Sequence, residues 1–128
     1  MKLGYTIFYV PDVPAALAFY EAAFGLKVRF VTDEGDYGEL ETGATVLAFA
    51  GEALAGSHGF SFDPQRPPHR PAMELALVTD DVQAAYDRAL TAGATSLAAP
   101  SRKPWGQEVC YVSDLNGFTV EICTPVGG

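Results

Sequence analysis

YVPDVPAALAFYEAAFGLKV, residues 9–28, contains the end of a strand and the start and end signals of a helix. Asp12 is a good N-cap, a proline is tolerated in the first helical turn, and Gly25 ends the run. The apolar positions share the spacing of one helix face: Val13, Leu17, Tyr20 and Phe24. This stretch therefore predicts a strand followed directly by an amphipathic helix.

The same pattern returns 69 residues later in VTDDVQAAYDRALTAGA, residues 78–94. Under that shift the cap residue Asp12 superposes on Asp81. Tyr5, in the strand before the first helix, superposes on Glu74. Repetition of a whole element order at a fixed period indicates two copies of one structural unit.

Strand-like segments surround both predicted helices in the same order. They are short β-branched or aromatic runs bounded by turn residues, at residues 3–10, 27–32, 37–41 and 45–50, and again at 72–78, 96–98, 107–112 and 118–123. Each half therefore has the order βαβββ, and the predicted fold class is α+β with mixed sheets.

The chain divides into module one, residues 1–55, a Pro-rich connector, residues 56–71, and module two, residues 72–125. Gly, Ser, His and Pro are frequent from residue 51 to residue 71, a composition that favours an extended chain over a helix. With 128 residues the chain suits one domain built from both modules.

Charge and composition exclude several classes of partner. The net charge is -8, and the eight Lys and Arg residues are too few for a nucleic-acid backbone partner. No apolar run approaches the roughly 20 residues that span a bilayer. The sequence starts with a strand pattern and no secretion signal, so we expect a cytoplasmic protein with no membrane partner.

Three segments carry a family resemblance: residues 9–28, residues 78–94, and VSDLNGFTVEI at residues 112–122. Together they resemble the vicinal oxygen chelate superfamily, which contains glyoxalases, ring-cleavage dioxygenases and bleomycin-resistance proteins. The likeness covers nearly the entire chain. It implies that paired modules form a curved sheet, a cup with the ligand on its concave side and helices outside, and that the protein is a homodimer.

Metal-dependent members of that family place His or Glu at four equivalent strand positions. By the motif resemblance these positions are Tyr5, Ala48, Glu74 and Glu121. Two carboxylates and no histidine remain, so we expect no metal cofactor, although two carboxylates and water could hold Mg or Mn weakly. The two histidines lie in the connector and are expected on the surface.

The residues predicted to face the ligand combine the family positions with aromatic side chains: Tyr5, Tyr9, Ala48, Glu74, Trp105, Tyr111 and Glu121. Tyr37 and Phe49 are further candidates for an aromatic wall. Glu74 and Glu121 are the candidate catalytic residues, because two nearby carboxylates can raise each other's pKa. They could equally attract a cation, or simply pair with Arg, water or Tyr hydroxyls.

The pairing of the closing hairpin decides whether the two cysteines are close enough to form a disulfide. Pairing about the turn at residues 113–117 predicts Val109 opposite Glu121, and Cys110 beside Val120 on the face away from Cys123. We therefore expect free thiols and no internal disulfide.

Three functions follow from this sequence. The preferred one is a small-molecule-binding protein that resembles bleomycin-resistance proteins and sequesters a cationic or aromatic ligand in an acidic cup without metal. The alternative is a lyase, isomerase or dioxygenase that uses Glu74 and Glu121 as acid-base groups or divalent-metal ligands. A structural or regulatory module with an empty cup is the third.

Overall fold

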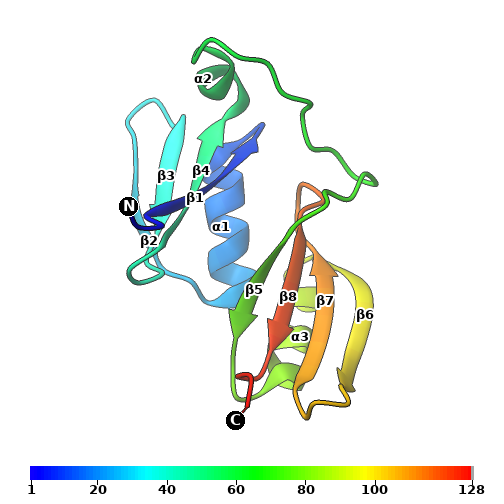
Figure 1. Cartoon of the computed structure of the whole chain (residues 1–128). Helices are drawn as coiled ribbons and strands as arrows, with labels where there is room; N and C mark the ends of the chain where they lie inside the picture. The colour runs from blue at the N-terminus through cyan, green and yellow to red at the C-terminus, as the bar shows by residue number, and fades with distance from the viewer. Residues whose placement is uncertain (128) are drawn as a thin grey trace. The chain divides into compact units, whose positions relative to one another are not determined.

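The computed structural model describes residues 1–127. The chain forms two compact units, one made of Met1–Glu21 and Gly25–Gln65, the other of Ala22–Phe24 and the residues from Arg66 onward. Each unit holds a four-stranded mixed sheet with a helix against it (Figure 1). The predicted α+β fold with two βαβββ modules is confirmed.

Module one contains four strands and two helices: β1 (Tyr5–Val10), α1 (Val13–Phe24), β2 (Val28–Val31), β3 (Tyr37–Leu40), β4 (Val46–Gly51) and α2 (Glu52–Gly56). The strand order is β1-β4-β3-β2. β1 runs parallel to β4, and the other neighbours are antiparallel.

Helix α1 begins and ends as predicted. The Asp12 carboxylate accepts a hydrogen bond from the backbone N–H of Ala15 at 3.0 Å, which satisfies a free donor of the first turn. Gly25 adopts a left-handed φ of 70° and closes the last turn. The predicted apolar face packs on the sheet, where the centre of the Tyr20 ring lies 4.9 Å from the centre of the Phe49 ring.

Module two repeats this plan with β5 (Glu74–Val78), α3 (Val82–Thr91), β6 (Thr95–Arg102), β7 (Glu108–Ser113) and β8 (Thr119–Cys123). Its strand order is β5-β8-β7-β6, with β5 parallel to β8. The Asp81 carboxylate caps α3 by accepting from Ala84 N–H at 3.0 Å. Both helices that the repeat predicts therefore start on an aspartate cap.

Two elements differ from the sequence prediction. The stretch after residue 51 is not extended throughout, since Glu52–Gly56 form the short helix α2. Its glutamate, alanines and leucine favour helix, and the proline-rich composition begins only later.

Strand β6 is longer than the predicted residues 96–98. It continues past Pro100 to Arg102. Its pairing with β7 is irregular on both sides of Ala98, and this irregularity lets the strand include the proline. A proline is tolerated in an edge strand at such a bulge, where its missing N–H costs no ladder hydrogen bond.

The register of the closing hairpin is shifted by two residues from the prediction. Glu121 pairs with Tyr111 rather than with Val109, and Cys110 pairs with Ile122 rather than with Val120. A two-residue shift keeps every side chain on its predicted face. Cys110 and Cys123 therefore still lie on opposite faces, and both are free and buried.

No helix in residues 1–127 is both long enough and apolar enough to cross a lipid bilayer.

Candidate functional site

In module two, alternation along β5 separates two faces of the sheet. Glu74, Ala76 and Val78 are exposed, whereas Leu75 and Leu77 are half-buried on the other side. β5 pairs Ala76 with Glu121 on β8, and β8 pairs Glu121 with Tyr111 on β7. Glu74, Glu121 and Tyr111 therefore project from three neighbouring strands on one face, the face of the exposed β5 residues. Helix α3 packs against β6, β7 and β8 on one side of this sheet (Figure 1).

These side chains and Cys123 share one face of the sheet and form an acid cluster, defined as Glu74, Tyr111, Glu121 and Cys123. The Tyr111 hydroxyl donates to Oε1 of Glu121 at 2.9 Å. Glu74 lies diagonally across from Glu121 on the neighbouring strand β5, and Cys123 is two residues further along β8 on the same face. The structure thus brings together three of the residues that the sequence predicts for the site, and adds Cys123.

The acid cluster raises the pKa of its members. Although Glu74 is exposed, partial desolvation of its carboxyl, and then the neighbouring Glu121 carboxylate, raise the pKa of Glu74 above that of an ordinary glutamate. Burial and the same carboxylate raise the pKa of Tyr111 to about 12 and that of Cys123 to about 11. Tyr111 and Cys123 therefore stay protonated at neutral pH and act as hydrogen-bond donors.

At the corresponding positions of module one, a tyrosine and an alanine stand in place of the two glutamates. Tyr5 pairs with Val46 as Glu74 pairs with Thr119, so the two positions are equivalent in register. Tyr5 is 58% exposed and available for contact. Ala48 is 0% exposed, so its predicted role in ligand contact has no accessible surface in the structure.

Glu39, on the same face of the module-one sheet as Ala48, is a polar residue that the sequence did not lead us to predict. It pairs with Ala48 across the β3–β4 ladder and is only 7% exposed. Its carboxylate accepts from the Tyr37 hydroxyl at 2.7 Å and lies 3.6 Å from the Arg29 guanidinium. Side chains alternate between the two faces along Tyr37–Leu40, so Tyr37 and Glu39 share one face. This alternation could have identified Glu39 from the sequence.

Two aromatic residues predicted for the ligand face, Tyr9 and Phe49, have different surroundings in module one. The Tyr9 ring packs in a tilted arrangement against the ring of Phe62 in the connector, with the ring centres 4.8 Å apart. Phe49 is fully buried in the module-one core, so it does not belong to an aromatic wall.

Trp105 is 63% exposed in the loop between β6 and β7. Its indole N–H donates to Oε1 of Gln107, whose amide in turn donates to the carbonyl of Thr124, just past the end of β8. Glu74 pairs at the opposite end of β8, with Thr119. Trp105 and Glu74 therefore lie at opposite ends of this strand.

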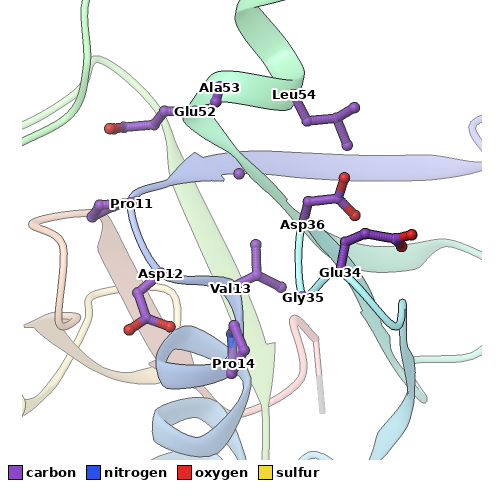
Figure 2. Close-up of a pocket in the computed structure, with 11 residues that line it drawn as sticks. Pro11, Asp12, Val13, Pro14, Glu34, Gly35, Asp36, Glu52, Ala53 and Leu54 are labelled. Atoms are coloured by element: carbon purple, nitrogen blue, oxygen red, sulfur yellow. The ribbon is translucent and has the colours of Figure 1, made fainter.

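A pocket of about 550 Å³ lies elsewhere, at one end of module one (Figure 2). It is lined by the start of α1, the β2–β3 turn and the β4–α2 junction: Pro11, Asp12, Val13, Pro14, Glu34, Gly35, Asp36, Gly51, Glu52, Ala53 and Leu54. The Asp12 carboxylate caps α1, and that of Asp36 accepts from the Thr32 hydroxyl at 2.7 Å. These two carboxylates have structural partners, and we place the candidate site at the acid cluster instead.

Residues 2–122 match the sequence profile of the Glyoxalase/Bleomycin resistance protein/Dioxygenase superfamily. The chain belongs to this superfamily. No curated protein shows a significant match to the sequence.

Several solved structures share the fold of this chain. A glyoxalase-related enzyme from Fulvimarina pelagi aligns with a TM-score of 0.83 at 23% identity, over 97% of this chain and 88% of its own. A protein of unknown function from Agrobacterium tumefaciens aligns with a TM-score of 0.79 at 26% identity, over 98% and 94%. A superfamily member from Sphaerobacter thermophilus gives 0.74 at 21%, over 98% of both chains.

The residues at the superfamily's metal positions do not fit a metal ion in this chain. Ala48 has no donor atom, and Tyr5 offers a phenol where metal-dependent members place His or Glu. Across residues 1–127, no three His, Cys, Asp or Glu side chains gather closely enough to form a metal site. Zinc sites take three or four such donors, and Mg²⁺ held by only two carboxylates keeps several of its waters.

Proposed function

We propose that this superfamily member is a small-molecule-binding protein that takes a cationic or aromatic ligand on the acidic face of module two, without a metal. The acid cluster is the observation that carries this proposal. Glu74 and Glu121 lie diagonally across β5 and β8, and Arg29 of module one pairs with Glu39 and Glu41 instead. A carboxylate pair without a basic partner attracts an organic cation.

Net charge and aromatic surface support the same ligand class. A net charge of -8 raises the local concentration of cations and speeds their encounter with the protein. Tyr111 borders the carboxylates and can contact the ring or ammonium of a ligand. Tyr5 is exposed on module one and can serve the same purpose there.

An acid-base enzyme of the lyase or isomerase kind is the second candidate. The raised pKa of Glu74 favours it, because general acids and bases work best when their pKa lies near the working pH. In that case Glu74 and Glu121 would exchange protons with a substrate that carries a carbonyl group.

Thermal unfolding of chelator-treated protein with a panel of cationic and aromatic antibiotics tests the proposal. A ligand at 100 times its Kd stabilises the folded state by about 2.7 kcal/mol. We expect stabilisation by at least one cation, loss of this effect in Glu121→Gln, and its retention in Glu108→Gln. Glu108 is a matched control because it lies one strand away on the opposite face.

Two results would contradict the binding function. Stabilisation by a small keto acid, with none by any antibiotic, would favour the enzyme. Activity that appears only when a tightly bound divalent metal is restored would show that the carboxylates serve a metal.

We also propose a cytoplasmic homodimer. Two free cysteines are compatible with a reducing compartment. Exposed Tyr5 and Ile7 on module one and Val78 on module two provide apolar surface for a second copy.

A further inference from the structure

The β6–β7 loop, residues 102–107, holds an exposed indole in a fixed position. Trp105 is the only tryptophan of the chain and is 63% exposed. Its indole N–H donates to Oε1 of Gln107 at 2.8 Å, and the Gln107 amide donates to the carbonyl of Thr124 at 2.7 Å. Gln107 is only 8% exposed, so these hydrogen bonds tie a ring that lies in solvent to a buried side chain.

Further hydrogen bonds order the backbone of this loop. The N–H of Lys103 donates to the carbonyl of Gln107 at 2.7 Å, and the N–H of Gly106 donates to the carbonyl of Lys103 at 2.9 Å. The Arg102 guanidinium donates to the carbonyl of Gly106 at 2.7 Å. A contact surface that is already ordered loses little conformational entropy when it docks against a partner.

The loop is positively charged in a chain whose net charge is -8. Residues 102–106 contain Arg102 and Lys103 and no acidic residue, and Glu108 pairs with Arg102 at the base of the loop. Tryptophan and arginine are enriched among the residues that dominate binding energy at protein interfaces. The loop therefore has the composition of a protein-docking surface, and its partner should combine apolar surface with acidic side chains.

The pocket at one end of module one offers this combination (Figure 2). Val13, Pro14 and Leu54 are among its apolar lining residues, and Glu34 and Asp36 are among its acidic ones. Its volume of about 550 Å³ lies within the roughly 300–1,000 Å³ of sites that enclose a drug-sized molecule. The pocket therefore has room for an indole ring.

The carboxylates of the pocket have no cationic partner of their own. Asp36 accepts from the Thr32 hydroxyl, a neutral donor. Within residues 1–127 the Glu34 carboxylate has neither a hydrogen-bond partner nor an ion-pair partner. Two molecules of net charge -8 repel each other, so a contact between two copies of this chain needs a local match of opposite charges. The loop and the pocket provide that match.

We propose that the β6–β7 loop of one copy docks in the module-one pocket of a second copy. The Trp105 indole packs on the apolar lining, and Arg102 and Lys103 face Glu34 and Asp36. In a two-fold dimer this contact forms twice, because each copy contributes one loop and one pocket. The inference rests on the proposed homodimer and gives it a specific contact.

The single tryptophan reports the contact directly. Sedimentation of the full chain should show a reversible monomer–dimer equilibrium. Over the same concentration range the fluorescence of Trp105 should move to shorter wavelength, because the indole leaves water on docking. An emission maximum that stays at its monomer wavelength in the dimer would overturn the docking.

One substitution on each side of the contact tests its two halves. Trp105→Ala in the loop and Glu34→Lys in the pocket should each weaken dimerisation by about tenfold or more. The matched controls are Leu115→Ala, at a 49% exposed residue of another module-two turn, and Asp33→Lys, beside the pocket but outside its lining. Both controls should stay within about threefold of the wild type.

Mixing the two variants separates a lost contact from a lost fold. Glu34→Lys keeps the loop with its tryptophan, and Trp105→Ala keeps the pocket without any tryptophan. Adding Trp105→Ala protein should move the emission of Glu34→Lys protein to shorter wavelength, because the intact loop meets an intact pocket. The double variant Trp105→Ala/Glu34→Lys should leave that emission unchanged. The same response to both added proteins would overturn the docking.

Sedimentation also distinguishes this inference from the homodimer on which it rests. A dimer that Ile7→Lys dissociates, and that Trp105→Ala and Glu34→Lys leave unchanged, would overturn the docking and keep the homodimer. A wild type that stays monomeric at every concentration would remove both.

Discussion

At the scale of single residues, Glu121 lies on the central strand of the acid cluster, and Glu74 is the member whose ionised form is destabilised there. Glu121 accepts a hydrogen bond from Tyr111 of the neighbouring strand β7, whereas Glu74 lies near another acid and stays exposed. Such an arrangement is less stable than the same sheet with a neutral side chain, as is common where residues are kept for binding rather than for stability.

Replacement of Glu74 by Gln should therefore stabilise the protein at pH 7. The folded-state pKa of Glu74 is raised, so the folded chain holds its proton more tightly than the unfolded chain, and stability falls as pH rises through this range. The gain should be below about 1 kcal/mol, because Glu74 is exposed.

Urea unfolding of the wild type and Glu74→Gln at neutral and acidic pH checks this sign. The difference should disappear below about pH 4, where Glu74 is protonated in both states. A variant that is less stable than the wild type at pH 7 would contradict the raised pKa.

At the scale of elements, the aspartate caps define both long helices. Asp81→Ala should lower the free energy of unfolding by about 1 kcal/mol, because the N–H of Ala84 then loses its acceptor in the first turn. The neighbouring Asp80→Ala is the matched control, since it removes the same charge without the cap. Equal effects of the two substitutions in denaturant titrations would show that charge, not capping, matters there.

The contact of α1 with its sheet depends on Gly38 in β3. A Cβ placed there would lie 2.5 Å from Cδ1 of Leu17 and 3.1 Å from the carbonyl oxygen of Phe30. Gly38→Ala should therefore destabilise the protein by about 1–3 kcal/mol through overpacking. Gly4→Ala, where a Cβ meets no atom within 4 Å, should change the unfolding midpoint little.

Several elements followed from the sequence because their signals are local. Asp12 and Asp81 cap helices through bonds to residues three positions away, and Gly25 ends α1 by its own backbone freedom. β6 was underestimated, since its length depends on β7 accommodating an irregular edge strand around Pro100. α2 was missed because a composition averaged over residues 51–71 concealed its five residues.

At the scale of the whole molecule, the proposed homodimer fixes how many copies of the chain act together. The proposed homodimer predicts a light-scattering mass near twice 13.6 kDa at micromolar concentration. Replacement of the exposed Ile7 by Lys should lower that mass toward the monomer value if the module-one face is the interface. A wild-type mass of one chain at every concentration would exclude the dimer.

The sequence alone determined the duplicated βαβββ plan, the capped helices and the face on which each residue of the closing hairpin lies. These depend on spacing along the chain, which repeats every two residues in strands and every 3.6 in helices. Only the tertiary structure decided that Tyr111 donates to Glu121, that Ala48 is covered, and that Glu39 pairs with Arg29. Those contacts depend on strand register, and a two-residue shift preserves every face while it changes every partner.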